Sequence, residues 1–250
     1  MSANGERLRD PRQRDERATR ILDVAGGLLL RHGYRRVTID DVAAEAAIGK
    51  GTVYLHWKTR EQLFRAVFAR EVLFALDELR RALEDDARSC LLHRFASTYY
   101  LAIAGRPLLR RFLLGDPDLL GKLTSSPDDD RDARHGEVAQ GYFALLAEHG
   151  MLRDDLTAAE TGHAYQATFE GFLRAGATPA APTPERQAEL LARTVRRAFE
   201  SDADVPDATA AQVATATAAL LSDLITADRT AFGIPRPQPH RGSADYPLSR

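Results

Sequence analysis

The chain has 250 residues, which exceeds the ~100 to 200 residues of one domain and favours two. With 44% hydrophobic and 28% charged residues it has the balance of a soluble globular protein, which excludes a disordered chain. Residues 1–70 carry 14 Lys and Arg against 9 Asp and Glu, whereas the remaining 180 carry 20 against 27. The N-terminal part is therefore basic and the rest of the chain is acidic. Binding of phosphate groups at one end of a protein requires such a charge distribution.

Targeting and redox signals are sparse. No apolar run approaches the ~18 residues that span a bilayer, and the polar start MSANGERLRD lacks the apolar stretch of a signal peptide. We therefore expect a cytoplasmic protein with no membrane partner. Cys90 is the single cysteine, which excludes an internal disulfide and a cysteine-based zinc site, and we expect its thiol to be buried and inert.

Apolar residues recur at helical spacing along the whole chain, while strand-like alternation is nearly absent. This pattern predicts an all-α fold of roughly ten helices. In chain order, we expect helices at about 16–31, 39–46, 50–56, 60–83, 88–104, 107–123 with a break at Gly115, 127–149, 156–175, 184–201 and 207–231. The two ends, 1–14 and 234–250, look mobile from their composition.

Residues with capping chemistry mark the helix boundaries. Gly33 can take the conformation that ends the first helix. Thr38 is a natural N-cap with Asp41 three residues on, and Thr59 with Gln62 predicts a second capping box. Four prolines stand where a first helical turn tolerates them, and each is expected to open a helix: Pro107, Pro117, Pro127 and Pro184.

The most informative stretch is TIDDVAAEAAIGKGTVYLHWKTREQL, residues 38–63. Two short helices around a tight turn fit a helix-turn-helix, and the second has the length and exposed polar residues of a recognition helix. Val53 and Trp57, four residues apart, would hold that helix on its neighbours. Five residues are then left available to face a major groove: Lys50, Thr52, Tyr54, Leu55 and His56.

This segment resembles the TetR family, whose signature reads like GTVYLHW here, followed by a basic residue, an acidic residue and a leucine. The match covers about residues 21–68. The resemblance implies an N-terminal three-helix DNA-binding domain and a C-terminal helical domain for effector binding and dimerisation. We place a basic arm at 1–14, the helix-turn-helix domain at 15–60, the effector and dimerisation domain at 61–233 and a tail at 234–250.

The resemblance also implies roles for single residues. Thr38, Tyr54, His56, Lys58 and Arg60 would contact backbone phosphates, because hydroxyl, imidazole and cationic groups donate to phosphate oxygens. Base edges or thymine methyls would be reached from Lys50, Thr52 and Leu55, with Gly51 beside them. The arginines of the arm could enter an adjacent minor groove.

The segment departs from the family pattern at a few positions. The usual turn glycine is Ala47, which we expect to avoid a left-handed conformation, and the usual polar cap of the recognition helix is Gly49. Arg60 replaces the usual lysine, which keeps the charge but alters the phosphate geometry.

Two features of the acidic body suggest self-association and sensing. By resemblance, the helices at 156–175 and 184–201 pair with their copies in a homodimer, with internal core packing as the alternative. The expected interface residues are Ala164, Ala167, Gly171, Phe172, Leu191, Val195, Ala198 and Phe199. A small-molecule effector, whose identity the sequence leaves open, would bind an apolar pocket with a few polar groups, although core packing explains the aromatics nearly as well. The candidate lining is Tyr99, Tyr100, Arg110, Phe143, His163 and Phe169.

Two other classes of function compete with a regulator of transcription. An enzyme lacks support, because we find no metal-binding His pair, phosphate loop or nucleophile elbow, so we expect no catalytic residue, cofactor or metal. A helical interaction or ligand-binding protein without DNA binding remains the alternative. The basic N-terminal part favours a double-stranded DNA operator as partner, bound by a ligand-responsive repressor.

Overall fold

The computed structural model describes residues 10–116 and 129–236. Within these ranges the chain is helical, with no strands beyond an isolated bridge between Leu152 and Glu200, which confirms the expected all-α fold. The elements are α2 (Pro11–His32), α3 (Ile39–Glu45), α4 (Lys50–His56), α5 (Arg60–Asp85), η1 (Ala87–Cys90), α6 (Leu92–Ala104), α7 (Pro107–Leu113), α9 (Asp129–Glu148), α10 (Ala158–Gly176), α11 (Pro184–Phe199) and α12 (Asp207–Ala231).

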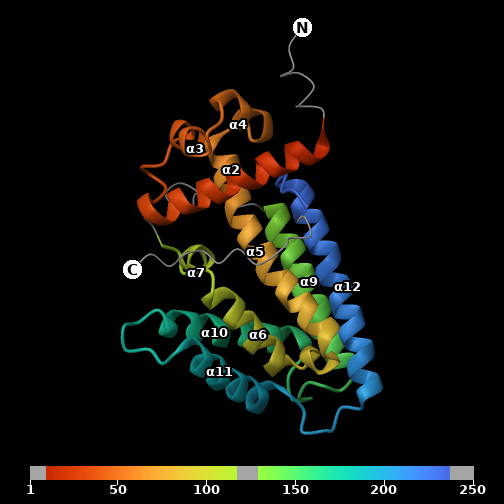
Figure 1. Ribbon diagram of the computed structural model, residues 1–250. Coiled ribbons are helices and arrows are strands. Elements are labelled where there is room, and N and C mark those ends of the chain that lie inside the picture. The colour runs from red at the N-terminus through yellow and green to blue at the C-terminus, as the bar shows by residue number, and fades with distance from the viewer. Residues whose placement is uncertain (1–9, 117–128, 237–250) are drawn as a thin grey trace.

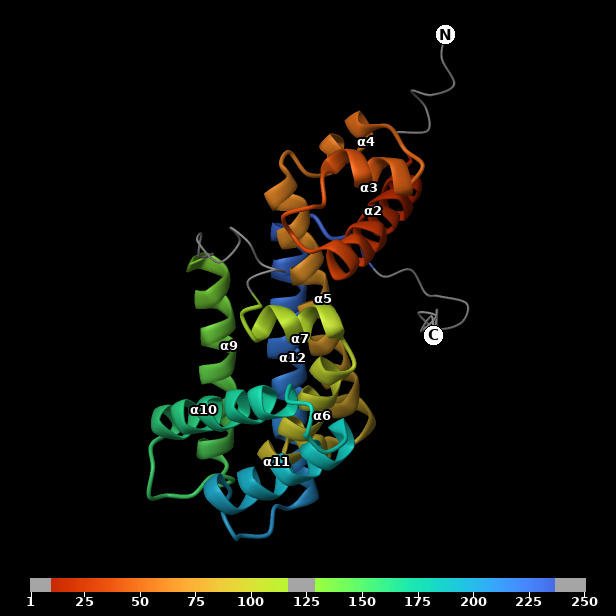
Figure 2. The same cartoon turned by 90° about the vertical axis from the view of Figure 1, so that its left-hand side faces the viewer.

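We refer to α2, α3 and α4 as the head and to α5 through α12 as the body. In Figure 1, α3 and α4 lie at one end of the molecule beyond α2, and α5 leads from the head into the body alongside α12. At the far end, α10 and α11 cross the direction of these long helices (Figure 2). α12 packs along α5 and against α9 and η1, while α11 packs on α6. The C-terminal end of α12 therefore returns to the head.

The first helix begins earlier than expected, inside the stretch assigned to a mobile arm. Asp10 accepts a hydrogen bond from the backbone N–H of Arg12, and Pro11 occupies the first turn, where its missing N–H costs nothing. Residues 11–14 are thus helical, and the rest of the expected arm lies outside the described residues. Pro107 and Pro184 open α7 and α11 as predicted, whereas Pro117 and Pro127 fall outside the described residues.

α12 is long and apolar enough to cross a membrane by length and composition alone, contrary to the expectation that no segment approaches this. The described structure gives its apolar face a protein partner instead. Val213, Leu221 and Leu224 are buried, and the helix lies along α5 and α9. Such a helix is typical of the core of a bundle.

Buried polar groups fix the helices of the body to each other. Asp228 of α12 is fully buried and receives hydrogen bonds from Arg134 and His135 of α9, at 2.8 Å each. Burial alone would raise the pKa of Asp228, but these hydrogen bonds outweigh it and hold the pKa below its usual value. Cys90 is buried as expected, and burial raises the pKa of its thiol to about 11, which keeps it protonated and inert.

Candidate nucleic-acid interface

The turn between α3 and α4 is built from local chemistry. Thr38 caps α3 in a reciprocal box with Asp41, as predicted: the Asp41 N–H donates to the Thr38 hydroxyl at 3.2 Å, and the Thr38 N–H donates to the Asp41 carboxylate at 2.8 Å. Gly49 caps α4 with no side-chain bond. Ala47 adopts a φ of +53°, so our expectation that it avoids a left-handed conformation is wrong. The turn imposes this geometry, and alanine there is strained relative to glycine.

The recognition helix α4 is held by two side chains and presents others to solvent. Val53 is fully buried and Trp57 is nearly so, which confirms them as the anchors. Trp57 also donates a hydrogen bond from Nε1 to the carbonyl of Phe232, 3.1 Å away, beyond the end of α12. On the opposite side, Tyr54 is 37% and Leu55 54% exposed. These two side chains are therefore available for contacts outside the chain.

The two lysines in and just after α4 already donate hydrogen bonds within the head. Lys50 donates to the Asp40 carboxylate at 2.8 Å, and this hydrogen bond raises the pKa of Lys50. Lys58, just beyond the helix, donates from Nζ to the carbonyl of Tyr54 at 3.2 Å. Both pairs are exposed, so they can be exchanged for phosphate or base contacts at little cost. Asp40, which the sequence reasoning overlooked, is therefore the partner that Lys50 must leave in order to make any other contact.

Two of the expected phosphate contacts are placed differently by the structure. The Thr38 hydroxyl is exposed but donates to the Asp41 carboxylate at 2.7 Å, so a phosphate must displace that carboxylate. The guanidinium of Arg60 is turned inward, 4.4 Å from the ring centroid of Tyr34 and donating to the carbonyls of Tyr34 and Val37. This cation closes the loop between α2 and α3, so it would have to leave these partners to reach DNA, and the Arg60 phosphate contact stays a prediction.

The cap at the start of α5 also differs from the prediction, because one of its two hydrogen bonds comes from the neighbouring residue. Thr59 accepts from the Gln62 N–H at 3.1 Å, as expected of its N-cap. The return bond, however, runs from the Lys58 N–H to the Gln62 side chain at 2.8 Å, so the predicted second capping box is wrong in its reciprocal half.

The remaining candidates, Gly51, Thr52 and His56, differ in burial. Thr52 and His56 are half-buried, and Gly51 is exposed with no atom within 4 Å of where a Cβ would stand. Burial, together with the charges of Arg14 and Arg17, lowers the pKa of His56. The protein's own packing thus does not require glycine at position 51.

In the body, three of the six residues proposed to line an effector pocket belong to a cluster of aromatic rings. Tyr99 stacks on Phe169 with ring centroids 5.4 Å apart, and Tyr165 links Phe169 to Phe143 at 5.8 and 5.5 Å. The Tyr165 hydroxyl, which we had not singled out, is buried with no hydrogen-bond partner in the described part of the chain. Such a group is uncommon in a folded protein.

Of the other three candidates for that pocket, Tyr100 meets the ring of Phe169 edge-on at 6.3 Å between centroids, whereas Arg110 and His163 are not aromatic members of the cluster. Tyr100 donates to Gln187 at 2.9 Å, and Arg110 donates to the carbonyl of Gly176. His163 is exposed, so the structure does not bring it into the ring cluster. The lining of an effector pocket stays a prediction.

The expected dimer surface is corrected by the packing of α11. Leu191, Val195 and Phe199 are buried within their own chain as α11 packs on α6, so the internal alternative holds for these three. A single apolar stripe can face only one partner, and here that partner is intramolecular. The surface that remains exposed or half-buried is made of Ala164, Ala167, Gly171, Phe172 and Ala198.

Comparison with known proteins agrees with this geometry. Residues 21–67 match the model of the family described as bacterial regulatory proteins, tetR family. The uncharacterised HTH-type transcriptional regulator Rv1556 of Mycobacterium tuberculosis is 43% identical over 63 residues, which cover 25% of this chain and only 31% of that protein. The HTH-type transcriptional repressor Rv3405c of the same species is 30% identical over 176 residues, covering 62% of this chain and 88% of the repressor.

The fold is also similar to that of SmeT, the repressor of the Stenotrophomonas maltophilia multidrug efflux pump SmeDEF. The TM-score is 0.55 at 19% identity, covering 76% of this chain and 95% of SmeT. SmeT has also been solved as a complex with triclosan. Given the extent of the match to Rv3405c, the chain belongs to the TetR family and carries the helix-turn-helix of a DNA-binding transcriptional regulator.

Proposed function

We propose that the protein is a ligand-responsive repressor that binds a pseudo-palindromic DNA operator as a homodimer. The observation that carries this proposal is the exposed face of α4, where Tyr54 and Leu55 stand in solvent beside Lys50. A tyrosine hydroxyl and a lysine ammonium donate to phosphates or base acceptors, and a leucine contacts a thymine methyl. The repressor Rv3405c, similar over most of its length, supports repression as the sign of control.

The surface left on α10 and α11 supports dimerisation. Ala167, Gly171 and Ala198 are exposed and small, which lets another helix approach closely. Glu170 of α10 and Arg197 of α11 are also exposed and carry opposite charges, which favours α10 of one protomer against α11 of its partner. Two recognition helices ~35 Å apart would then enter successive major grooves on one face of DNA.

An apolar effector bound at the ring cluster is supported by the Tyr165 hydroxyl. A buried hydroxyl without a partner costs free energy, and a ligand that accepts its hydrogen bond would recover that cost. The triclosan complex of SmeT shows an apolar phenol bound by a repressor of this fold. Effector binding would act by favouring a conformation whose heads are misplaced for DNA.

DNA binding is tested by selecting duplexes from a random library and titrating the selected operator by fluorescence anisotropy. We expect Tyr54→Ala to weaken operator binding by about tenfold, the size of one lost phosphate contact, without changing the oligomeric state. Leu156→Ala is the matched control, because Leu156 is a similarly exposed apolar residue outside the head. Equal affinities for the two variants would show that Tyr54 does not meet DNA.

A salt titration separates this function from a helical module without DNA binding. Counterion release predicts that the logarithm of the binding constant falls linearly with the logarithm of salt concentration, and steeply when several phosphates are contacted. Absence of any selected sequence, together with a flat salt response, would leave the interaction module as the better description.

The proposed binding of an effector at the ring cluster is tested with the variant Tyr165→Phe. Removal of an unpartnered buried hydroxyl should raise the free energy of unfolding by about 1 kcal/mol without ligand, measured by urea denaturation. With triclosan as the probe, release of operator should be weaker in Tyr165→Phe than in wild type. A destabilised variant would mean that the hydroxyl already has a partner, and would remove the argument for a ligand there.

A further inference from the structure

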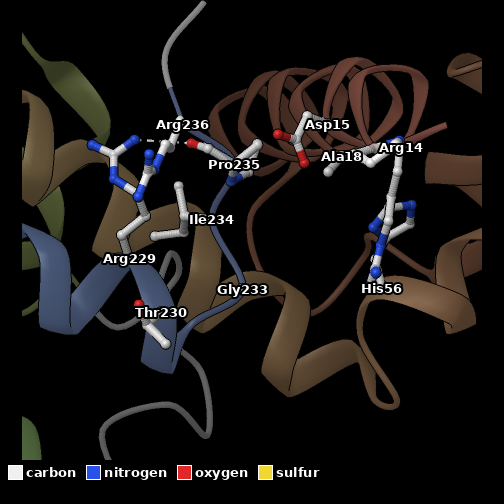
Figure 3. A pocket seen from close by; sticks show the side chains of 11 residues that line it. Arg14, Asp15, Ala18, His56, Arg229, Thr230, Gly233, Ile234, Pro235 and Arg236 are labelled. Carbon is white, nitrogen blue, oxygen red and sulfur yellow. Dashed lines mark hydrogen bonds between the residues drawn. The ribbon is translucent and has the colours of Figure 1, made fainter.

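A cavity of about 470 Å³ lies where the end of α12 meets the head. Its walls come from three segments that are distant in sequence: the first turns of α2, the last residue of α4, and residues 229–236 at and beyond the end of α12 (Figure 3). Figure 3 shows Arg14 and His56 on one side, Arg229 and Arg236 on the other, and Asp15 between them. The volume falls in the range of small-molecule sites, ~300 to 1,000 Å³.

The lining carries more cationic than anionic side chains. Three arginines and His56 face one carboxylate, that of Asp15. In the described ranges, no carboxylate is found within ion-pair distance of Arg14, Arg229 or Arg236, although arginines elsewhere, such as Arg31 and Arg88, do form such pairs. Burial is the main cause that lowers the pKa of Arg229; the charge of Asp77 opposes this lowering, and the charge of Arg236 adds to it. An anion in the cavity would give the three arginines a partner of opposite charge.

The cavity also spans the joint between the recognition helix and the body. Trp57, adjacent to His56, donates its hydrogen bond to the carbonyl of Phe232, and Gly233 follows with a φ of +61°. Ile234 is buried, and the guanidinium of Arg229 donates to the carbonyl of Pro235 at 3.0 Å, which curls this segment over the end of α12. A ligand held by His56 and Arg236 would therefore contact both sides of the joint.

We propose that this cavity is a second ligand site, which takes a small anion bearing a phosphate or carboxylate group and opposes DNA binding. The opposition follows from charge: the anion occupies Arg14 and His56 at the edge of the DNA-facing surface, where its negative charge repels phosphates of the operator. Because coupling between two sites is reciprocal, bound DNA must weaken the binding of the anion by the same factor. The coupling rests on the proposed operator binding, whereas the site itself does not.

Trp57 is the single tryptophan of the chain, so its fluorescence reports on this joint. Inorganic phosphate and, separately, succinate are titrated at constant ionic strength against chloride. We expect a saturable change with at least one anion, and about tenfold weaker binding in Arg236→Gln, the loss of one charged hydrogen bond. Arg193→Gln is the control, because Arg193 is an exposed arginine of α11 outside the cavity. No saturable change, or equal weakening in both variants, overturns the site.

The coupling is read from operator anisotropy with and without the saturating anion. We expect operator affinity to fall by about tenfold in wild type and to be nearly unchanged in Arg236→Gln. If Arg236→Gln weakens operator binding without any anion, the cavity cations belong to the DNA interface and the proposal is overturned. If wild type binds no DNA at all, the proposed function and the coupling fail together, while the fluorescence titration still decides the site.

Discussion

The ion pairs described within the head are exposed, whereas the body holds buried charged groups beside its exposed pairs. In the head, Lys50 with Asp40 and Arg31 with Glu45 form ion pairs in which every side chain is 44% or more exposed. In the body, the carboxylates of Asp228 and Glu200 are 1% and 8% exposed and are held by groups from other helices. Exposed pairs contribute little and exchange partners readily, whereas buried pairs are costly to break. Charge changes should therefore act on DNA binding in the head and on stability in the body.

The largest effect is expected from Asp228→Asn, which removes the charge that joins α12 to α9. The variant removes the negative charge and replaces one of the two oxygens that accept from Arg134 and His135 with an amide NH2 group. We expect a loss of about 3 kcal/mol in the free energy of unfolding, near the low end for buried pairs because both partners are partly exposed. Urea denaturation measures this loss. Asp223→Asn, an exposed aspartate on the same helix, is the control and should lose little.

The pH dependence of the same variant has a defined sign. Because the pKa of Asp228 is lowered in the fold, its stabilisation is present above the unfolded value, about 3.9, and is lost as pH falls through the folded pKa. The stability difference between wild type and Asp228→Asn should be full at neutral pH and shrink below about pH 4. A difference that is constant down to pH 3 would contradict the assigned ionisation.

The comparison between head and body also explains what the sequence could predict. The head was predictable because its signals are local: Thr38 with Asp41, Thr59 as N-cap, and the spacing of Val53 and Trp57 all act within a few residues. The start of α2 carried a usable signal too, since aspartate followed by proline favours a helix start, but the arginine-rich composition favoured a mobile arm.

What the sequence could not predict depends on contacts between distant segments. Helical spacing shows that Leu191, Val195 and Phe199 share one buried face, but not whether the covering helix belongs to the same chain. Arg60 turns inward because Tyr34 offers its ring from another loop. The cavity at the joint combines residues near positions 14, 56 and 230, and no periodic pattern marks such a meeting.

A smaller effect, with opposite signs on stability and binding, is expected from Gly51→Ala. No atom of the head restricts a Cβ there, so replacing glycine within a helix should raise the free energy of unfolding by about 0.5 kcal/mol. If the glycine serves close approach of DNA, operator affinity should fall by about tenfold, the size of one lost contact. Paired urea and anisotropy measurements decide this, and unchanged affinity would remove Gly51 from the interface.

The smallest effect, and the finest test of the exchangeable charges in the head, is expected from Asp40→Asn. Lys50 must leave Asp40 or share it to reach DNA, so loss of this carboxylate should raise operator affinity by about threefold, most at low salt. Glu45→Gln removes one negative charge from the same helix, but from the pair with Arg31, and so controls for net charge.

The two variants can be compared on more than one sequence. If Asp40 also orients Lys50, Asp40→Asn should bind unrelated duplexes better by a larger factor than it binds the selected operator, because a freed lysine finds phosphates anywhere along DNA. Equal gains for Asp40→Asn and Glu45→Gln would mean that only net charge matters. The pair between Lys50 and Asp40 would then have no part in sequence preference, and the exposed charges of the head would act as an undirected attraction.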